Sequence, residues 1–204
     1  MLRLVPGSPL VIATHNQGKR QEFATLLASA GIICTDAAAL NLDEPAETGA
    51  DFAENAQIKA LSAARTSGLA ALADDSGLSL AALGGDPGLR SARFAQECGG
   101  YAEAMTRLIA ASRGDPRAWF TCALCLAMPT GETATYLGFC HGQIADHPRG
   151  AKGFGYDPIF VPSGQAASFA ELSAEQRHQI SHRARAISQF LAVLPVLTQE
   201  AVLC

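Results

Sequence analysis

The stretch that decides the fold is residues 73–94, ADDSGLSLAALGGDPGLRSARF. The apolar run before it, residues 69–73, predicts a buried strand that gives way to a loop at Asp74 and Asp75. Open α/β sheets bind ligands at the loop ends of their strands. Adjacent strand residues point to opposite faces, so one carboxylate is expected to enter a site while its neighbour braces the backbone. Aspartate, serine and glycine also dominate simple turns, and a plain turn is the alternative interpretation of this stretch.

The composition is ordinary for a soluble α/β enzyme, and the length suits one compact domain or two small lobes. The chain has 204 residues, of which 49% are hydrophobic, 17% charged and 6% aromatic, which excludes a disordered chain. A net charge of −4 gives no basic surface for nucleic acid, so we expect no nucleic-acid partner. Residues 6–9, PGSP, interrupt the apolar start of the chain, and no run reaches the length of a membrane span. We therefore expect a cytoplasmic protein without membrane association.

The cysteines show no disulfide framework. They are Cys34, Cys98, Cys122, Cys125, Cys140 and Cys204. Cys122 and Cys125 form a C-x-x-C pattern without a second ligand pair, inside an apolar run. The sequence therefore predicts reduced thiols, with these two in the core on opposite faces of a strand.

The chain begins with a predicted strand at residues 10–13, a turn THNQGKR at residues 14–20, and a helix. The apolar face of that helix is Phe23, Leu26, Leu27 and Ala30, and Gly31 closes it. Lys19 and Arg20 stand at the helix start, where the macrodipole disfavours cations, so a bound phosphate is expected there. The turn is not a Walker A loop, because Arg20 follows Lys19 and alanine occupies position 13.

The middle of the chain alternates polar loops with regular elements. A loop at residues 41–50 precedes a helix over about residues 51–67, for which Asp51 and Glu54 resemble a capping pair. Apolar residues at helical spacing predict a helix over residues 101–112. Two strands joined by a turn are expected at residues 119–128 and 133–140.

Two stretches near the end carry candidate binding groups. Residues 152–162, KGFGYDPIFVP, place aromatic rings on a glycine-rich loop, which either stack on a nucleobase or pack into the core. Residues 173–194 predict either one helix or a helix broken near Ile180, with Ser181 capping the second part. In a continuous helix Arg177 and Arg183 would face apart, whereas the break lets them converge.

Five motifs together resemble one known family. They are ATHNQGKRQEF (13–23), ETGADFAENAQIKA (47–60), the stretch 73–94, KGFGYDPIF (152–160) and ISHRARA (180–186). In this order and spacing the chain resembles the inosine and xanthosine triphosphate pyrophosphatases. The resemblance implies hydrolysis of ITP, dITP and XTP to the monophosphate and pyrophosphate with Mg²⁺, which removes them from the nucleotide pool. It further implies a homodimer of a single domain, residues 1–204. That domain has two lobes, a mixed central sheet flanked by helices, and a substrate cleft between the lobes.

The resemblance also implies roles for individual residues. Glu47 and Asp75 match the Mg²⁺ ligands, and Asp75 matches the proton acceptor for the attacking water. The residues that match substrate contacts are Thr14, His15, Asn16, Gln17, Gly18, Lys19, Ser76, Phe154, Gly155, Tyr156, Asp157, Arg177, His182 and Arg183. Among these, Lys19 would touch the triphosphate and Phe154 would stack on the purine. Lys59 and Asp74 are expected to support the site, without an assigned role.

Elementary chemistry agrees with these roles. Attack of water on the α-phosphorus requires a base and neutralisation of phosphate charge, which Mg²⁺ and clustered cations supply. An arginine aimed at position 6 of the purine donates to a keto oxygen but repels the amino group of adenine. We assign this role to Arg183, supported by His182. Position 177 is usually lysine in the family, and Arg177 keeps the charge on a planar, forked donor.

Three alternatives remain at this stage. One is a triphosphate pyrophosphatase of other base preference, for dUTP, dCTP or a methylated nucleotide, which residues 181–183 and 153–158 disfavour. A second is a nucleotide-binding regulatory module without turnover, which leaves the carboxylates Glu47, Asp74 and Asp75 unexplained. The third is a metal-free structural protein, in which charged, glycine-rich motifs would serve no packing purpose.

Overall fold

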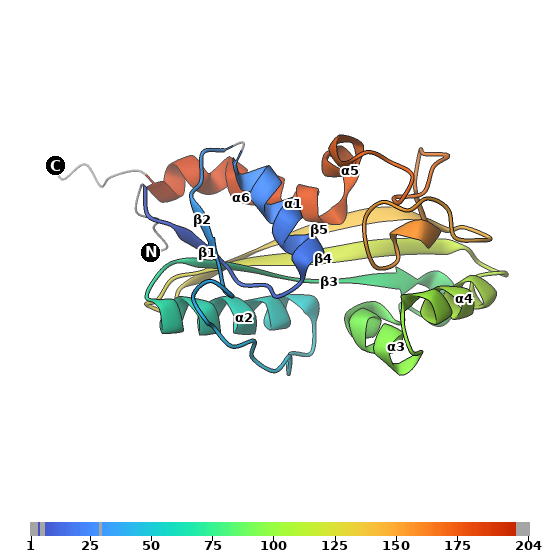
Figure 1. Ribbon diagram of the computed structural model, residues 1–204, viewed down its shortest axis with the longest axis horizontal. Coiled ribbons are helices and arrows are strands. Elements are labelled where there is room, and N and C mark those ends of the chain that lie inside the picture. Colours follow the sequence, from blue (N-terminus) through green and yellow to red (C-terminus); the bar gives the residue numbers. More distant parts are fainter. Residues whose placement is uncertain (1–3, 5–6, 29, 199–204) are drawn as a thin grey trace. The chain divides into compact units, whose positions relative to one another are not determined.

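The structure is a computed structural model that describes residues 4, 7–28 and 30–198. The described strands are β1 (Leu10–Ile12), β2 (Cys34–Asp36), β3 (Ala71–Leu80), β4 (Arg117–Ala127), β5 (Thr133–Ile144) and β6 (Phe160–Pro162). The described α-helices are α1 (Gln17–Ala28), α2 (Phe52–Ser67), α3 (Ser91–Glu97), α4 (Tyr101–Ala111), α5 (Ala174–Ile180) and α6 (His182–Thr198) (Figure 1). Cys204, and part of the apolar start of the chain that residues 6–9 interrupt, lie outside the described residues.

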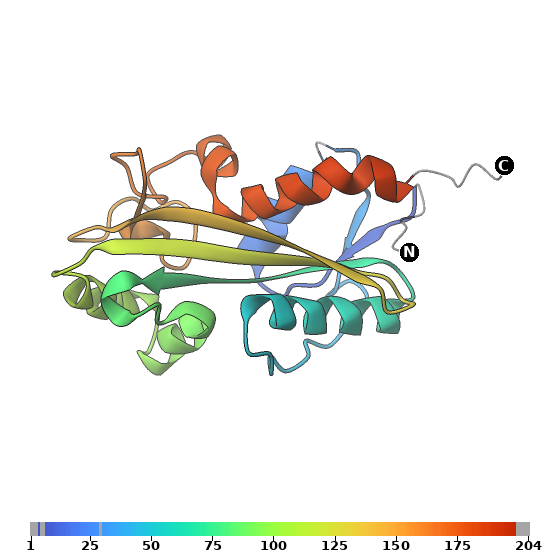
Figure 2. The same cartoon turned by 180° about the vertical axis from the view of Figure 1, so that it is seen from behind.

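The strands form one mixed sheet in the order β2-β1-β3-β4-β5-β6. β1 pairs in parallel with both β2 and β3, and β5 pairs antiparallel with β6. Helices flank this sheet, which confirms the predicted α/β class. The parallel part is doubly wound, because α1 connects β1 to β2 on one face and α2 connects β2 to β3 on the other (Figure 1, and from behind Figure 2).

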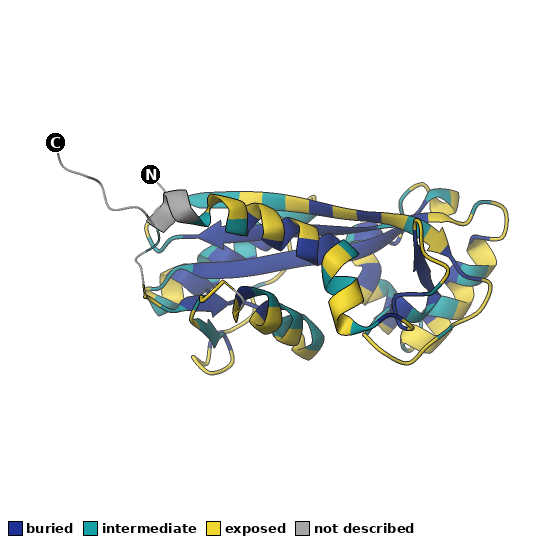
Figure 3. Cartoon of the chain, turned by 90° about the horizontal axis from the view of Figure 1, so that it is seen from above, coloured by how far each residue is buried: buried dark blue, intermediate teal, exposed yellow. Residues whose placement is uncertain are grey.

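The chain divides into two compact units, each with its own apolar core. Unit 1 comprises the described residues up to Asp75, Ala123–Leu137, and the described residues from Ala186; unit 2 comprises Ser76–Cys122 and Gly138–Arg185. The core of unit 1 is rich in alanine, to which α2 contributes Ala56, Ala60, Ala63 and Ala64. The core of unit 2 is built around large side chains such as Phe120, Phe160 and Phe169. Buried residues concentrate in the strands, and exposed residues on the outer faces of the helices (Figure 3).

The prediction that the first long strand ends at Asp74 and Asp75 is wrong. β3 continues to Leu80, so the pair lies in the middle of a strand. The strand continues because Leu78 and Leu80 pack into the core of unit 2. At Gly77 the backbone passes so close to its neighbour that an added Cβ would lie 2.1 Å from a carbonyl oxygen. The turn predicted for the pair comes later, in the glycine-rich residues 84–88.

Several local predictions are confirmed. The side chain of Asp51 accepts a hydrogen bond from the backbone N–H of Glu54 and caps α2. Ser181 separates α5 from α6 and accepts from the N–H of Ala184, so the helix is broken rather than continuous. The cysteines at 34, 98, 122, 125 and 140 form no disulfide, and those at 122 and 125 are buried. One detail differs: α1 ends at Ala28, which leaves Ala30 outside the helix and exposed. No described helix is both long and apolar enough to cross a membrane.

Candidate functional site: carboxylates and cations in unit 1, an aromatic loop in unit 2

The topology of unit 1 defines where a ligand is expected. The strand order reverses between β1 and β3, because α1 leads to β2 on one side of β1 and α2 leads to β3 on the other. A crevice for ligands forms at the carboxyl ends of the strands at such a switch point. Thr14 lies two residues after the end of β1, and Asp74 and Asp75 lie just beyond the last residues of β3 that pair with β1. The two predicted motifs therefore meet at this point.

The turn after β1 is fixed by its own side chains. Thr14 is buried, and its Oγ1 accepts a hydrogen bond from the N–H of Asn16 at 3.2 Å. The Oδ1 of Asn16 accepts from the N–H of Lys19 at 3.1 Å and so caps α1. The Nζ of Lys19 lies 3.0 Å from Oδ2 of Asp74. The Asp74 carboxylate thereby offsets the charge of Lys19 at the positive end of the helix dipole.

Asp75 faces the other side of the strand and contacts α2. The Nζ of Lys59 lies 3.5 Å from Oδ1 of Asp75 and 2.6 Å from Oε1 of Glu47. Burial raises the pKa of Asp75 above its ordinary value, although Lys59 acts in the opposite direction. Burial acts to lower the pKa of Lys59, but Asp75, Asp74 and Glu47 together hold it above its ordinary value. The predicted pair Glu47 and Asp75 is thus brought together around one cation.

Sequence reasoning missed Asn55, which joins this group from α2. Its Nδ2 donates to Oδ2 of Asp75 at 3.1 Å, and its Oδ1 accepts from the N–H of Gly49 at 2.8 Å. The signal in the sequence was the spacing ENAQIK, because Asn55 and Lys59 are four residues apart and share a helix face. On that face they are polar, buried residues among alanines.

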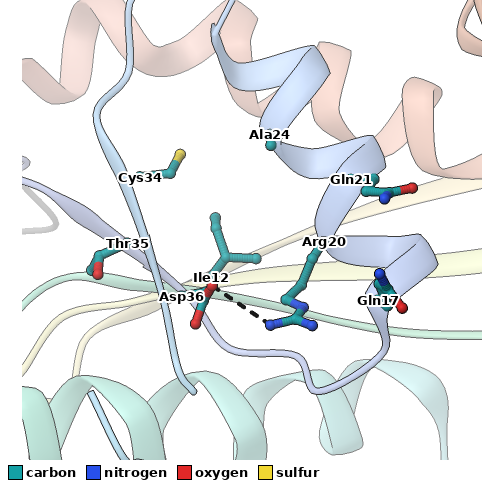
Figure 4. Close-up of a pocket in the computed structure, with 8 residues that line it drawn as sticks. All are labelled: Ile12, Gln17, Arg20, Gln21, Ala24, Cys34, Thr35 and Asp36. Carbon is teal, nitrogen blue, oxygen red and sulfur yellow. Dashed lines mark ion pairs between the residues drawn. The ribbon is translucent and has the colours of Figure 1, made fainter. Parts of the chain in front are cut away.

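Of the other predicted residues of unit 1, Gln17 lies apart from this group, whereas His15 lies near Lys59. Gln17 lines a separate cavity of about 350 Å³ between α1 and β2, where Arg20 forms an ion pair with Asp36 at 3.6 Å (Figure 4). Cys34 also lines this cavity, and burial raises the pKa of its thiol. His15 is exposed and lines a small pocket together with Lys59. Gly18 is half-buried in the first turn of α1.

In unit 2, residues 153–157 form a tight loop braced by Asp157. Oδ2 of Asp157 accepts from the N–H of Phe154 at 3.0 Å. Gly153 has a φ of 75°, and a Cβ there would lie 2.0 Å from the same oxygen, so only glycine is accommodated. The hydroxyl of Tyr156 donates to the carbonyl of Ser91 at 2.9 Å. Asp157 and Tyr156 are buried and hold the loop, which leaves the Phe154 ring half-buried.

Arg183 and His182 begin α6 and are buried in unit 2. The guanidinium carbon of Arg183 lies 5.7 Å from the ring centroid of Phe154. The imidazole of His182 stacks on Phe120, with centroids 4.6 Å apart and planes within 9°. Arg177 is less directly involved, because its Nη1 donates to the carbonyls of Phe169 and Leu172. Ser76 is half-buried, directly after Asp75.

The Phe120 ring supports His182 from the core side, and its loss is expected to destabilise unit 2. Phe120 also packs edge-on against Phe160, with centroids 4.8 Å apart. We expect Phe120→Ala to lower the free energy of unfolding by about 3 kcal/mol, because it leaves a cavity beneath the imidazole. Phe139→Ala, at an exposed phenylalanine of β5, should lower it by less than about 0.5 kcal/mol. Chemical denaturation measures both, and equal losses would contradict the role of Phe120.

In the part of the chain that the structure describes, no three His, Cys, Asp or Glu side chains are grouped closely enough to hold a metal ion by themselves. Mg²⁺ is commonly bound by one or two carboxylates together with waters and phosphate oxygens. A carboxylate pair such as Glu47 and Asp75 has the hard oxygen donors that this ion prefers.

Comparisons with known proteins agree with the motifs. A model of the Ham1 family matches residues 10–193. The dITP/XTP pyrophosphatase of Gluconobacter oxydans (strain 621H) is 51% identical over 193 residues, which cover 94% of this chain and 93% of that protein. The protein of the same name from Rhodospirillum centenum (strain ATCC 51521 / SW) is 50% identical over 195 residues, 93% of this chain and 96% of that protein. A solved HAM1 protein from Coxiella burnetii superposes with a TM-score of 0.81 at 39% identity, covering 92% of this chain and 98% of that one. The family resemblance drawn from the sequence is thereby confirmed.

Proposed function

The chain belongs to the Ham1 family, and from that premise we propose that it hydrolyses non-standard purine nucleoside triphosphates, namely ITP, dITP and XTP. Water attacks the α-phosphorus, the bond to the β-phosphate breaks, and the products are the monophosphate and pyrophosphate. Relatives named dITP/XTP pyrophosphatase, 51% and 50% identical over nearly the whole chain, support this reaction. The observation that carries it is the group of paired charges at the switch point, where Lys19 pairs with Asp74, and Lys59 pairs with Asp75 and Glu47. Lys59, Asp74 and Asp75 are buried in this group.

Unit 1 has groups suited to the phosphates. Lys19, at the capped start of α1, would bind the triphosphate after leaving Asp74, because phosphate oxygens favour cations and helix N-termini. Asp75 would accept the proton of the attacking water, and a raised pKa suits a base that works near neutral pH. Glu47 and Asp75 would hold Mg²⁺. When bound, this ion would neutralise charge on the phosphate oxygens.

Unit 2 has groups suited to the base. The Phe154 ring offers a face for stacking, and the buried guanidinium of Arg183 offers donors to the keto oxygen that inosine and xanthosine carry at position 6. Adenine carries an amino group at position 6, so binding of ATP would leave the buried donors of Arg183 unpaired. The proposed enzyme acts in the cytoplasm as a homodimer, as the family resemblance implies.

The experiment that tests the function is release of pyrophosphate from ITP, XTP, dITP, ATP, GTP and dUTP in parallel, with Mg²⁺ and with EDTA. We expect release from ITP, XTP and dITP that requires Mg²⁺, at rates at least about 100-fold above those for ATP and dUTP. Release chiefly from dUTP would move the assignment to a pyrophosphatase of other base preference. Binding of these nucleotides without any release would indicate the regulatory module instead.

A further inference from the structure

We propose that Asn55 is a positioning residue whose side-chain amide fixes the orientation of the Asp75 carboxylate and the distance of the Glu47 loop from it. The inference rests on the proposed function, because it assigns how the base and the metal ligands of that site are oriented. Asn55 is only 2% exposed, and both ends of its amide are used within unit 1. It touches neither phosphate nor metal in this role, and acts through Asp75 and Gly49.

The hydrogen bonds determine which way the amide points. The N–H of Gly49 is a donor, so the amide atom 2.8 Å away must be the oxygen. Nδ2 is then the atom that faces Asp75, and it can only donate. Oδ2 of Asp75 is consequently fixed as an acceptor, and Oδ1 is directed towards Lys59. One amide therefore sets the rotation of the carboxylate about its Cβ–Cγ bond.

The same amide ties the loop that carries Glu47. Gly49 lies two residues after Glu47, and a Cβ at position 49 would come within 2.7 Å of Oδ1 of Asn55 and of Cβ of Glu54. The loop can approach α2 this closely only with glycine at position 49. The bond from Asn55 then holds the backbone next to Glu47 at a set distance from Asp75.

The position of Asn55 on α2 supports a role in the site rather than in general packing. Ala56, Ala60 and Ala64 are fully buried on this helix, and Asn55 and Lys59 are the long polar side chains buried beside them. A buried amide among alanines is costly unless both of its ends are paired. Here both partners belong to the Asp75 and Glu47 group, so the amide is placed where that group needs orientation.

Asn55→Leu keeps the size of the side chain and removes both hydrogen bonds. We expect kcat for ITP to fall about 10- to 100-fold, as for other residues that orient metal ligands, with KM changed less than about threefold. The matched control is Gln57→Leu on the same helix, which removes an amide bonded to Oγ1 of Thr133. A merely structural role would lower the unfolding temperature of both variants and leave kcat of the folded protein unchanged in both.

Two further variants test the two hydrogen bonds of the Asn55 amide separately. They also keep the proposal testable if Asn55→Leu does not fold. Asn55→Asp keeps the acceptor for Gly49 but replaces the donor by a second carboxylate, so kcat should fall at least as far. Gly49→Ala pushes the loop off Asn55 from the other side and should lower kcat by about 10-fold. Wild-type kcat in Asn55→Asp and Gly49→Ala would overturn the proposal.

A second readout does not depend on turnover. Binding of Mn²⁺ to the full chain, followed by electron paramagnetic resonance, should weaken about 10-fold in Asn55→Leu and remain unchanged in Gln57→Leu. Equal Mn²⁺ affinity in wild type and Asn55→Leu would overturn the positioning role. A wild-type chain that binds Mn²⁺ but releases no pyrophosphate would contradict the proposed function alone, and the Mn²⁺ titration would still decide the role of Asn55.

Discussion

Replacing Asp75 by asparagine is expected to lower kcat for ITP by about 1,000-fold while the protein still folds. The substitution removes the proposed proton acceptor and one of the two carboxylates that surround Lys59. The fold should persist, because burial already raises the pKa of Asp75 and the surroundings therefore favour a neutral side chain of this shape. The measurement is steady-state release of pyrophosphate, with circular dichroism to compare the folded content of the two proteins.

The matched control for Asp75→Asn is Asp36→Asn. Asp36, the last residue of β2 in unit 1, also pairs with a cation, Arg20, but it is half-exposed and lines the separate cavity of Figure 4. Its loss should change kcat by less than about threefold, since exposed ion pairs contribute little. Near-normal turnover in Asp75→Asn would remove the proposed base, whereas equal losses in both variants would point to general electrostatic disruption of unit 1.

Removal of the buried guanidinium in Arg183→Ala is expected to narrow the preference for ITP over ATP by about 100-fold, since the proposed charged hydrogen bond to the keto oxygen would be lost. We expect kcat/KM for ITP to fall, while kcat/KM for ATP stays unchanged or rises. Arg183 is 2% exposed and lies over Phe154. A lysine at this position would keep the charge but would lack the planar, forked donor group of arginine. The measurement is kcat/KM for the two nucleotides side by side.

Arg185→Ala provides the control for this selectivity. Arg185 lies two residues further along α6, is exposed, and donates from Nη1 to the carbonyl of Phe139 at 2.7 Å. Its removal changes net charge by the same amount and should leave the ratio of ITP to ATP within about twofold. An unchanged ratio in Arg183→Ala would place the selectivity elsewhere in the protein.

The parts of the fold that the sequence predicts well are those with local causes. A helix cap can be predicted from residues within one turn, as for Asp51 with Glu54. For residues 173–194 the sequence left a continuous and a broken helix open, and the structure has the break at Ser181. The motif order was specific enough to indicate the family. The motifs also brought Lys19, Glu47 and Asp75 into one candidate group, although their separation in the sequence gives no distance.

The remaining features depend on contacts between distant residues. β3 continues past Asp75 because Leu78 and Leu80 fill a core built largely from residues after position 90, which no local pattern around the carboxylates reveals. Phe120 supports His182 from 62 residues away along the chain. Asn55 looks like an ordinary helical asparagine until β3 places Asp75 beside it. Polar side chains whose partners come from other strands acquire their roles only when the sheet is assembled.

The division of the chain into two interleaved units constrains the order in which the protein can mature on the ribosome. Unit 1 draws on three separate segments, the last of which begins at Ala186 within α6. In that segment Phe190 packs against Tyr136 of β5, and Gln189 donates to the carbonyl of Leu137. Lys19, Glu47 and Asp75 are synthesised first, yet the unit that holds them is completed by the final helix. A nascent chain therefore carries the residues proposed to bind phosphate and metal long before the fold that positions them is complete.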